Sequence, residues 1–432
     1  MSQETENSAD VLILGASFAG VELVYQLQRG AGGRALKIAV VDRQEEHPYI
    51  PLVHERLVGR IDPAATVLPT RRALQARGVR YVVGEIAGFD PERKEVHLRS
   101  GERLRGRFVV VALGSVLAPP PAIPGAEHFV GYKSAGEFAD AARRLAALLG
   151  CGGEEGPANA GDADRSGPGG ARPAGAGSGT GGEAPARPTI VVVGGGISGV
   201  ELAGELAHLA RVRPPGWRAP RVVLVHAGER LLPNLCARAG RRAAHHLERQ
   251  GVELRLRARL IRLSPGTATL RPERGADEDV SCDMAFWSGG VRPAPILVEL
   301  GLPLTSDGWL AVGPTLQCFP EAKPTRPEIF AIGDAARIQS AAGEWSTMQR
   351  AIECLWQAKR TARNIARLHA EPPDYPRGVP PLDPHVLRED FPHGVSVGGA
   401  SLIVYGRLVL DFAAFNTWFR RFLMWQYIAR YT

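Results

Sequence analysis

The chain has 432 residues, which is long for one domain and enough for two or three, and its 44% hydrophobic content is normal for a globular protein with a sizeable core. Its formal net charge of +7 favours acidic partners, either nucleic acid or an anionic membrane surface. The arginines are scattered along the chain, and no zinc-finger or RNA-binding signature is present. We therefore expect no nucleic-acid partner.

The cysteines and the N-terminal residues bear on metal chemistry and on the compartment. Five cysteines lie far apart, without a CxxC or CxxxxC pair: Cys151, Cys236, Cys282, Cys318 and Cys354. This spacing argues against a disulfide framework, a metal site and a paired-thiol redox centre, and it fits a reducing cytoplasm. The polar start, MSQETENSAD, predicts no signal peptide, and no run approaches the roughly 18 apolar residues of a membrane span. Any membrane contact is therefore expected to be peripheral.

The first glycine-rich unit lies near the N-terminus. Residues 11–14 (VLIL) predict a short buried parallel strand, which runs into GASFAG, a helix-like stretch and a second apolar run that ends at Asp42. In this dinucleotide-fold layout, Gly15 allows the tight turn and Gly20 allows close packing of helix on strand. Phosphate would bind N–H groups at the helix N-terminus, and Asp42 would accept from a ribose hydroxyl. Ser17 occupies the usual place of the middle glycine, and an ordinary strand–helix turn is the alternative.

The pattern then repeats in a more complete form. Residues 189–209 give a strand, a full GxGxxG at Gly194, Gly196 and Gly199, and a helix, and the strand RVVLVH follows. Two such units imply two dinucleotides in one chain. Between them, residues 150–188 are dominated by Gly, Ala and Pro, so we expect a disordered insertion there.

Two further apolar runs end in residues suited to a cofactor site. FVVVALGS (108–115) predicts a strand ending in Gly114, where the missing side chain lets the backbone pass close to a cofactor. EIFAIGDAA (328–336) predicts a strand ending in Gly333 and Asp334, just before a helix. A carboxylate in that place can accept from sugar hydroxyls, and a plain helix N-cap is the alternative for Asp334.

The order GASFAG, ALGS, GGGISG and AIGDAA resembles that of the two-dinucleotide flavoprotein reductases, in which FAD and a nicotinamide nucleotide each occupy a Rossmann-like domain. The resemblance implies an α/β fold with a discontinuous FAD domain, residues 9–118 and 311–370. Residues 119–310 would form the nicotinamide domain, and residues 371–432 would form a C-terminal segment. The implied FAD-binding residues are Gly15, Ser17, Phe18, Ala19, Gly20, Asp42, Arg43, Gly114, Gly333, Asp334 and Gln349.

The segment after the expected FAD ribose site distinguishes between families of these flavoprotein reductases. Disulfide reductases of this superfamily carry a CxxxxC there, but here the region reads HPYIPLVHERLVG and has no cysteine. It resembles the flavin-side segment of type II NADH dehydrogenases, with matches at Tyr49, Pro51, Leu52 and Gly59. SGVELAGEL places Glu201 where that family has a glutamate between flavin and nicotinamide. WSGGVRP (287–293) is similar to the family's segment behind the nicotinamide.

TMQRAIEC (347–354) resembles the start of the same family's quinone-site helix, AQxAxQ. Gln349 and Ala351 match this pattern, whereas Met348 and Glu353 depart from it. The resemblance gives Gln349 a hydrogen bond to flavin or quinone and puts Glu353 in the quinone site. The helix start near Gln349 would direct its positive dipole end at the flavin. A solvent-facing amide is the alternative for Gln349.

The resemblance implies a FAD-dependent NAD(P)H:quinone oxidoreductase that pumps no protons, with hydride passing to flavin N5 and electrons then to a membrane quinone. Glu201 would orient the nicotinamide or relay a proton, and a structural helix carboxylate is the alternative. The second strand ends at His226 instead of an acidic residue, with Glu229 and Arg230 close by, so NADH and NADPH both stay open. The implied nicotinamide-site residues are Gly194, Gly196, Ile197, Ser198, Gly199, Glu201, His226 and Gly289.

The C-terminal stretch begins with strand-like alternation and becomes helical from about Asp411. One face of the expected helix gathers Phe412, Phe415, Trp418, Phe419, Phe422, Trp425 and Ala429, and the other gathers Asn416, Arg420, Arg421 and Tyr427. An aromatic face and a basic face predict a helix in the membrane interface, where each arginine near an anionic surface contributes about 1 kcal/mol. The expected location is the cytoplasmic face of the cell membrane. Packing on the body or a homodimer interface is the alternative.

Three other functions stay open. A sulfide:quinone oxidoreductase shares the fold, but it needs cysteines flanking the flavin, and Cys354 is the one thiol that keeps this function open. A soluble ferredoxin-type reductase would have no use for the aromatic tail. A NAD(P)H-binding redox sensor is the non-enzyme alternative, motivated by the departures at Ser17, His226 and Glu353.

Overall fold

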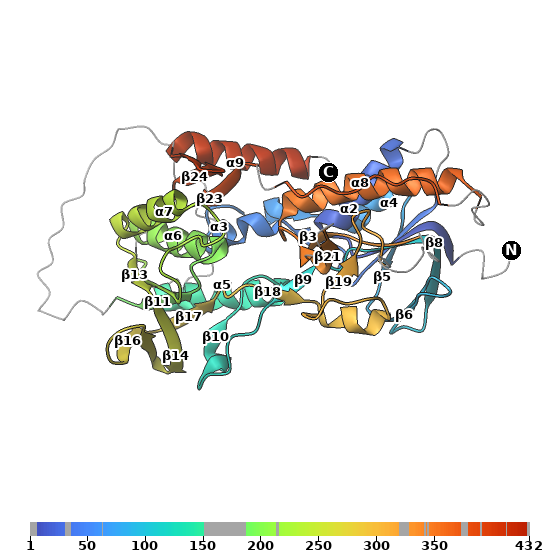
Figure 1. The fold of residues 1–432 in the computed structure, drawn as a ribbon. Coiled ribbons are helices and arrows are strands. Elements are labelled where there is room, and N and C mark those ends of the chain that lie inside the picture. The colour runs from blue at the N-terminus through green and yellow to red at the C-terminus, as the bar shows by residue number, and fades with distance from the viewer. Residues whose placement is uncertain are drawn as a thin grey trace, which may run out of the picture.

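Two sheets form the body of the protein, a first, mixed sheet to the right and a second, parallel sheet to the left in Figure 1. The computed structural model describes residues 7–30, 36–62, 64–150, 187–212, 216–318, 328–340, 343, 345–372, 379–388, 391–411 and 413–429. Nearly all of the expected insertion over 150–188 lies outside the described residues, as do Cys151 and Phe412.

The first sheet combines N-terminal strands with one late strand. Its order is β5-β2-β1-β8-β7-β6, and β20 pairs in parallel with β8. Helices α2 (Phe18–Gly30) and α8 (Ala351–Ala370) pack against each other beside it. Because β20 follows the second sheet in sequence, the chain returns to the first sheet after completing the second. The strands are β1 (Ser8–Leu14), β2 (Ile38–Asp42), β5 (Arg80–Val83), β6 (Ile86–Asp90), β7 (Glu95–Leu98), β8 (Arg103–Val111) and β20 (Ile329–Ala331).

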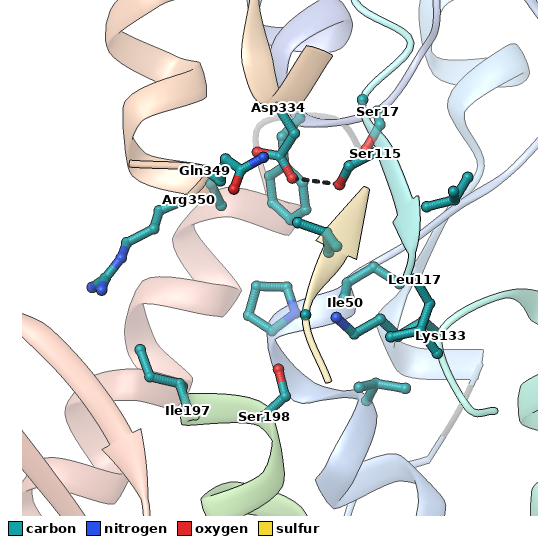
Figure 2. Close-up of a pocket in the computed structure, with 18 of the residues that line it drawn as sticks. Ser17, Ile50, Ser115, Leu117, Lys133, Ile197, Ser198, Asp334, Gln349 and Arg350 are labelled. Carbon is teal, nitrogen blue, oxygen red and sulfur yellow. Dashed lines mark hydrogen bonds between the residues drawn. The ribbon is translucent and has the colours of Figure 1, made fainter. Parts of the chain in front are cut away.

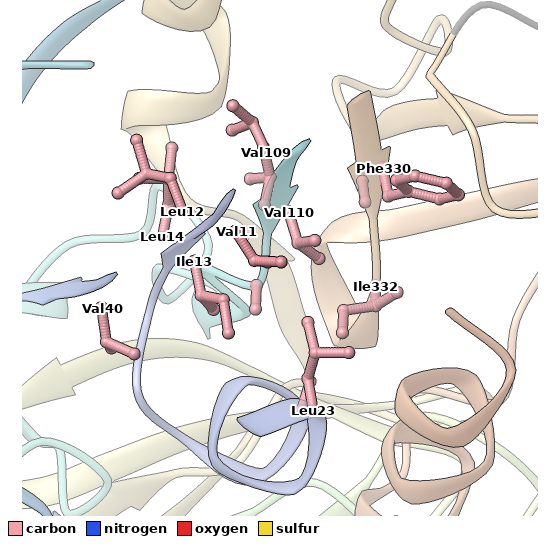
Figure 3. Close-up of a cluster of buried hydrophobic side chains, with 14 of the residues drawn as sticks. Val11, Leu12, Ile13, Leu14, Leu23, Val40, Val109, Val110, Phe330 and Ile332 are labelled. Atoms are coloured by element: carbon pink, nitrogen blue, oxygen red, sulfur yellow. The ribbon is translucent and has the colours of Figure 1, made fainter. Parts of the chain in front are cut away.

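The central strands of this sheet are buried on both faces, which explains their continuous apolar sequences. Residues 11–14 of β1 are fully buried, and Val109 and Val110 of β8 lie beside them. Leu23 of α2 and Phe330 of β20 belong to the same core (Figure 3). The core therefore joins residues from the beginning of the chain to residues after position 328.

Strand β8 differs from the strand predicted over residues 108–115. It begins at Arg103, where it pairs with β7, and it ends at Val111. Gly114 therefore lies in the turn after the strand, with φ = 69°. This left-handed backbone conformation explains a glycine at that position.

The second sheet contains the second glycine-rich unit, and both of its predicted strands are present. The strands are all parallel, in the order β10-β17-β11-β12-β13. Their bounds are β10 (Phe129–Val130), β11 (Thr189–Val193), β12 (Arg221–His226), β13 (Glu253–Leu256) and β17 (Met284–Trp287). The helices are α5 (Ala135–Leu149), α6 (Ile197–Val212) and α7 (Ala237–Arg249). The antiparallel strands β14 (Ala258–Ser264), β15 (Gly266–Pro272) and β16 (Glu278–Cys282) form a separate small sheet.

Short elements connect the two sheets. Strands β9 (Ser115–Leu117) and β18 (Val291–Pro293) pair antiparallel where the chain passes from one sheet to the other and back. The other short strands are β3 (His47–Pro48), β4 (Val67–Leu68), β19 (Leu310–Val312), β21 (Ala336–Gln339) and β22 (Trp345–Ser346). The short helices are α3 (Val53–Leu57) and α4 (Thr70–Gln75).

The C-terminal segment forms a small antiparallel sheet followed by a helix, as its sequence predicts. Strands β23 (His393–Ser396), β24 (Ser401–Tyr405) and β25 (Leu408–Leu410) precede α9 (Ala413–Ile428). The sheet lies tightly on α6, since a Cβ built on Gly204 would come within 2.6 Å of the backbone nitrogen of Gly398. Helix α9 packs on this sheet, at the top of Figure 1. Among the described helices, none combines the length and apolarity that a membrane crossing requires.

Candidate functional site

A cavity of about 2260 Å³ lies between the two sheets. A pocket for one drug-sized ligand measures about 300–1,000 Å³, so this cavity has room for more than one small molecule. Residues of both glycine-rich turns, of the 47–54 segment and of α9 line it. Figure 2 shows part of this wall, to which the first turn contributes Ser17 and the second turn contributes Ile197 and Ser198.

The first glycine-rich turn leaves no room for a side chain between β1 and α2. A Cβ built on Gly20 would lie 1.9 Å from the carbonyl oxygen of Gly15, and one built on Gly15 would lie 2.4 Å from that of Ala112. Gly15 also has φ = 107°, a conformation that favours glycine. The first turn of α2 borders the cavity through Phe18 and Ala19, so its N–H groups and helix dipole suit a phosphate.

Asp42 ends β2 and lines the cavity together with Arg43. One oxygen of Asp42 accepts the N–H of Ala16 at 2.7 Å, and the other accepts that of Gln44 at 2.9 Å. These bonds hold the half-buried carboxylate beside the turn and leave a second lone pair on each oxygen. The position suits a hydrogen bond from a ribose hydroxyl.

The second glycine-rich turn repeats this geometry between β11 and α6. A Cβ built on Gly199 would lie 1.8 Å from the carbonyl oxygen of Gly194, which itself has φ = 124°. A Cβ on Gly196, by contrast, would meet no atom within 4 Å. Gly194, Gly196, Ile197 and Ser198 line the cavity, whereas Gly199 acts through helix packing.

His226 ends β12 at the cavity wall. Its Nδ1 accepts the N–H of Gly195 at 3.1 Å, and burial lowers the pKa of its ring. The neutral ring therefore carries its proton on Nε2, which is buried without a hydrogen-bond partner among the described residues. A buried donor of this kind needs an acceptor, and a nucleotide oxygen would supply one.

The loop after His226 uses its charged side chains internally. The guanidinium group of Arg230 donates to three backbone carbonyl groups of residues 232–235, at 2.7–3.0 Å. Glu229 is paired with Arg257 at 2.8 Å. Arg230 is therefore not free to meet a 2′-phosphate, whereas Glu229 belongs to an exposed ion pair.

Gly333 and Asp334 follow β20, as predicted, but the helix predicted directly after them is absent. A 3₁₀ turn spans Gly333–Ala335 and β21 follows it, so the helix N-cap alternative for Asp334 is wrong. The carboxylate accepts from the Ser115 hydroxyl at 2.9 Å, and burial raises its pKa (Figure 2). Strand pairing of β20 with β8 brings these two residues to the same edge of the cavity.

Lys133 is a cavity residue that sequence reasoning missed. It lies before α5, whose N-cap is Ser134, and its ammonium group is largely buried at the wall (Figure 2). Burial lowers the pKa of Lys133, while the nearby carboxylate of Asp334 opposes this change. The capping sequence of α5 was the only local signal, and it marks a helix start instead of a binding site.

Gln349 lies in the loop before α8 with φ = 50°, a rare conformation for a residue other than glycine. The amide oxygen of Gln349 faces Arg337 and accepts hydrogen bonds from Nη1 and Nη2 of that arginine, at 3.1 and 3.0 Å. The side chain is half-buried and lines the cavity, so the solvent-facing alternative is wrong. The amide NH₂ group remains to donate to a ligand.

Glu353, expected in a quinone site, does not line the cavity. It is 1% exposed, and its carboxylate accepts from the Met348 N–H at 2.5 Å and from the Gln357 amide at 3.0 Å. As the third residue of α8, it reaches back to the preceding loop in the manner of a capping carboxylate. Glu353 therefore positions the loop that carries Gln349 and does not itself border the cavity.

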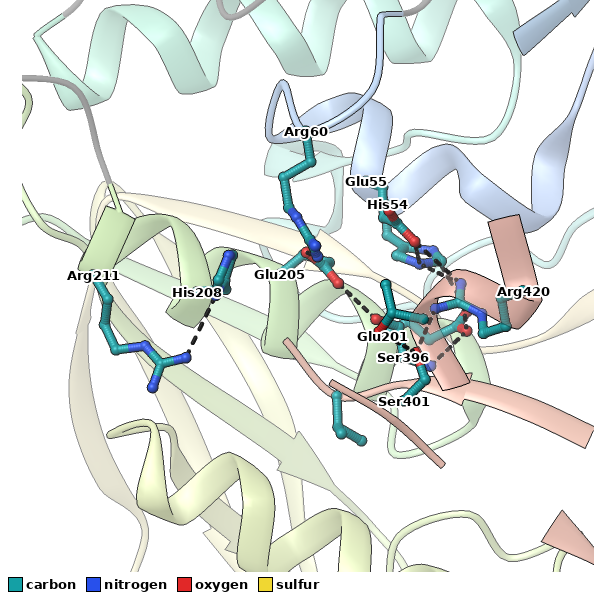
Figure 4. A network of polar contacts seen from close by, with 12 residues as sticks. His54, Glu55, Arg60, Glu201, Glu205, His208, Arg211, Ser396, Ser401 and Arg420 are labelled. Carbon is teal, nitrogen blue, oxygen red and sulfur yellow. Dashed lines mark hydrogen bonds and ion pairs between the residues drawn. The ribbon is translucent and has the colours of Figure 1, made fainter. Parts of the chain in front are cut away.

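Glu201 lies in α6 at the cavity wall, among other charged groups (Figure 4). Its carboxylate accepts the N–H of Ser396 at 3.1 Å, and it lies 3.4 Å from Nδ1 of His54 and 3.9 Å from Arg420. Burial raises the pKa of Glu201 to about 7, and Arg420 opposes this rise. A carboxyl group with this pKa exchanges a proton near neutral pH.

Helix α9 turns its basic face toward the body of the protein. The Arg420 side chain is 10% exposed and pairs with Glu55 at 3.3 Å, and Arg421 pairs with the same carboxylate at 3.1 Å. Tyr427 is also buried and packs on Phe18. The expectation that these arginines face anionic lipid is therefore wrong for Arg420, because the buried carboxylate of Glu55 requires their charge.

The segment 287–293 lies at the cavity, and its glycines accommodate the tryptophan. A Cβ on Gly289 would lie 1.9 Å from the ring of Trp287, whose Nε1 donates to the carbonyl of Ala118 at 2.8 Å. Trp287, Ser288 and Gly289 all line the cavity. This segment is thus brought beside the second turn and Glu201, which lie together in a distant part of the sequence.

Cys354 lines the cavity, and no second cysteine of the described residues does so. Burial, with the carboxylates of Asp334 and Glu353 nearby, raises the pKa of its thiol well above the usual range. The thiol is therefore protonated at neutral pH and is a poor nucleophile. This environment does not favour the sulfide:quinone alternative.

The two turns allow a reciprocal test. We expect Gly20→Ala to lose FAD, because its Cβ must displace α2 from β1. Gly199→Ala should keep FAD, but its flavin should no longer be reduced by nicotinamide nucleotides. Flavin absorbance of the purified proteins, and its bleaching by NADH or NADPH without oxygen, measure the two effects. Each variant is the matched control of the other, with circular dichroism as the check of folding. Retention of FAD by Gly20→Ala, or bleaching of Gly199→Ala at the native rate, would contradict this assignment.

Of three curated relatives, two carry the family name expected from the sequence motifs. The type II NADH:quinone oxidoreductase Ndh of Mycobacterium tuberculosis is 26% identical over 351 residues, covering 77% of this chain and 68% of that protein. The type II NADH:quinone oxidoreductase of Haemophilus influenzae is 25% identical over 393 residues, covering 84% and 81%. The demethylphylloquinone reductase NdbB of Synechocystis is 23% identical over 383 residues, covering 85% and 84%.

Solved structures share the fold. NDH2 from Plasmodium falciparum in complex with NADH superposes with a TM-score of 0.76 at 12% identity, covering 98% of this chain and 94% of that one. The sulfide:quinone oxidoreductase from Aquifex aeolicus gives 0.71 at 14% identity, covering 96% and 90%. The expected α/β fold with two Rossmann-like units is confirmed. Residues 9–358 match the family described as pyridine nucleotide-disulphide oxidoreductase, and the chain belongs to that family.

Proposed function

We propose that the chain is a FAD-dependent, type II NADH:quinone oxidoreductase that passes electrons from NADH to a membrane quinone. The observation that carries this proposal is the shared cavity, which both glycine-rich turns, Glu201 and α9 border. The names of the relatives in Mycobacterium tuberculosis and Haemophilus influenzae agree with it.

FAD fits the first turn. The first turn of α2 would hold the pyrophosphate on its N–H groups, and Asp42 would accept from a ribose hydroxyl. Asp334, held by Ser115, would accept from another sugar hydroxyl. When bound, FAD supplies the chemistry of taking up two electrons as hydride and releasing them to an acceptor. The proposed FAD residues are Gly15, Ser17, Phe18, Ala19, Gly20, Asp42, Arg43, Gly114, Gly333, Asp334 and Gln349.

NADH fits the second turn. The Nε2 proton of His226 would meet an oxygen of the adenosine ribose, and the first turn of α6 would hold the pyrophosphate. We propose NADH in preference to NADPH because Arg230 is held by backbone carbonyl groups and cannot meet a 2′-phosphate. Glu201 would orient the nicotinamide or move a proton beside it. The other proposed contacts are Gly194, Gly196, Ile197, Ser198, Gly199 and Gly289.

Gln349 is the proposed contact for quinone. Its NH₂ group would donate to a quinone carbonyl, while Arg337 holds its oxygen. Glu353 would support this contact by fixing the loop. Both interactions are present before quinone binds, so the amide of Gln349 is already oriented for the hydrogen bond.

The exposed face of α9 is the proposed membrane contact. Phe415, Trp418 and Trp425 are 58%, 59% and 62% exposed, and Leu423 is 46% exposed. Aromatic side chains of this kind favour the interface between headgroups and acyl chains. We place the contact at the cytoplasmic face, where the unpaired cysteines of this sequence would stay reduced.

Steady-state oxidation of NADH and NADPH with a soluble short-chain quinone tests the proposed activity. We expect quinone-dependent turnover with NADH. The kcat/KM for NADPH should be at least about tenfold lower, because its 2′-phosphate loses water on binding and the loop after His226 offers no arginine to pair with it. The matched control is the same assay with Gly199→Ala. Absence of quinone-dependent oxidation of both nucleotides would rule out the proposed function.

The combined variant Phe415→Ser, Trp418→Ser and Trp425→Ser tests the membrane contact. We expect at least about tenfold weaker binding to phospholipid vesicles in a flotation assay, because these side chains supply the exposed apolar area. Activity with soluble quinone should stay within about twofold, since Arg420 and Tyr427 on the inner face are retained. Removal of the whole helix is a poorer test, because it would leave Glu55 buried without its cations, at a cost of about 3–5 kcal/mol.

Undiminished vesicle binding by this variant would contradict the membrane proposal. If vesicle binding persists and a native dimer becomes a monomer in size-exclusion chromatography, the face is a homodimer interface instead.

A further inference from the structure

Three buried carboxylates meet where α3, α6 and α9 come together. Glu55 is 1% exposed, Glu205 is fully buried and Glu201 is 7% exposed (Figure 4). Charges in such surroundings must be paired, since desolvation costs several kcal/mol per ion. Three arginines supply the positive charge: Arg60, Arg420 and Arg421.

The three carboxylates differ in how well they are paired. Glu205 contacts Arg60 at 2.6 Å and accepts from the hydroxyl of Ser396 at 2.6 Å. Glu55 has both Arg420 and Arg421 within 3.3 Å. Glu201 has one backbone N–H, and Arg420 at 3.9 Å is its ion-pair partner among the described residues. Glu201 therefore depends on a single arginine of the C-terminal helix.

The side chain of Arg420 is held in a fixed path. Its stem passes over Gly394 of β23, where a built Cβ would lie 3.0 Å from Cγ of the arginine. Its Nη1 donates to the hydroxyl of Ser401 on β24 at 3.0 Å. Its Nη2 faces His54 at 3.4 Å and Glu55 at 3.3 Å. These contacts direct the guanidinium group inward, toward the carboxylates.

Resting on the proposed function, we propose that Arg420 is a positioning residue for Glu201. It favours the ionised form of the Glu201 carboxyl group at the cavity wall, so that proton exchange there depends on the docking of α9. The segment that carries the aromatic membrane face thereby also sets the charge of the group beside the nicotinamide site.

The surrounding charges agree with this role. The pKa of Glu201 is raised to about 7, because burial and the carboxylates of Glu55 and Glu205 raise it more than Arg420 and the N–H of Ser396 lower it. His54 does not replace Arg420 as a cation, because burial and the neighbouring arginines hold its pKa well below the usual range. The titratable and charged groups that face Glu201 are His54, Glu55, Tyr132, Glu205 and Arg420, and Arg60 pairs with Glu205.

A metal ion does not explain the cluster equally well. One ligand atom from each of His54, Glu55 and Glu205 lies within 4.8 Å of the other two, a spacing that a cation can bridge. Guanidinium groups already contact both carboxylates, so the charge that a metal would supply is present. The geometry therefore points to an internal ion-pair network.

The test is the pH dependence of kcat for Arg420→Gln, with NADH and a soluble quinone. If ionised Glu201 is required, activity falls as the pH drops through its pKa. Removal of Arg420 raises that pKa. The acid limb, meaning the fall of kcat on the acidic side of the pH profile, should therefore move to higher pH by about 1 unit or more. Arg420→Lys should restore most of the shift. Arg407→Gln, which removes the same charge from an exposed turn of the C-terminal segment, should leave the limb unchanged.

Two further measurements make the result specific. Glu201→Gln should abolish the acid limb that Glu201 causes, and adding Arg420→Gln in this background should neither restore that limb nor shift any residual pH dependence. An infrared titration of the carboxyl C=O stretch, which needs no turnover, should show Glu201 protonated at neutral pH in Arg420→Gln and more ionised in the native chain. If Arg420→Gln does not fold, Ser401→Ala removes the hydrogen bond to Arg420 and should shift the limb in the same direction by a smaller amount.

An unmoved limb in Arg420→Gln, or an equal shift in the Glu201→Gln background, would overturn the inference. The proposed function would survive that outcome, provided that the native chain oxidises NADH with quinone. A native chain without such turnover would instead refute the proposed function, and the infrared titration would then decide the role of Arg420 by itself.

Discussion

The close approach of two helices to the strands that precede them is the constraint on which the rest of the site depends. At Gly20 and Gly199 a single added methyl group would fall within 2 Å of a carbonyl oxygen, so α2 and α6 can begin where they do only with glycine at these positions. Each helix then presents its first turn to one cavity. Two helix N-termini at one cavity, each after the carboxyl end of a parallel strand, are what a chain that brings two dinucleotides together requires.

The C-terminal helix joins this centre to the surface. Its aromatic side faces solvent, and its basic side neutralises carboxylates that would be costly to bury alone. Phe419, Leu423 and Tyr427 also line the cavity, so the helix forms part of the wall as well as its outer cover. A lipid-borne acceptor would therefore meet the same helix that borders the nicotinamide and flavin sites.

Local contacts were predictable from the sequence, and long-range ones were not. The glycine spacings report steric contacts between residues a few positions apart, and residues 11–14 report burial on both faces of a sheet. A helical wheel, in contrast, shows which residues of α9 share a face but not which face the body covers, so the inward direction of Arg420 was missed. Lys133 was missed for the same reason, because the cavity that it lines is formed by tertiary packing. The capping role of Glu353 is a local contact, with Met348 and Gln357 as partners, and it was missed because the family resemblance implied a quinone contact for that residue. The helix expected after Asp334 failed because β21 pairs with β19, a contact outside the local sequence.

The central claim is that one cavity passes electrons from NADH through FAD to a quinone. Anaerobic stopped-flow spectroscopy of the flavin tests it most directly, with NADH mixed first and a soluble quinone mixed second. The account predicts bleaching of the flavin absorbance by NADH and its full return on addition of quinone. Bleaching without return would fit a nucleotide sensor, and absence of bleaching would contradict the claim that both dinucleotides share the cavity.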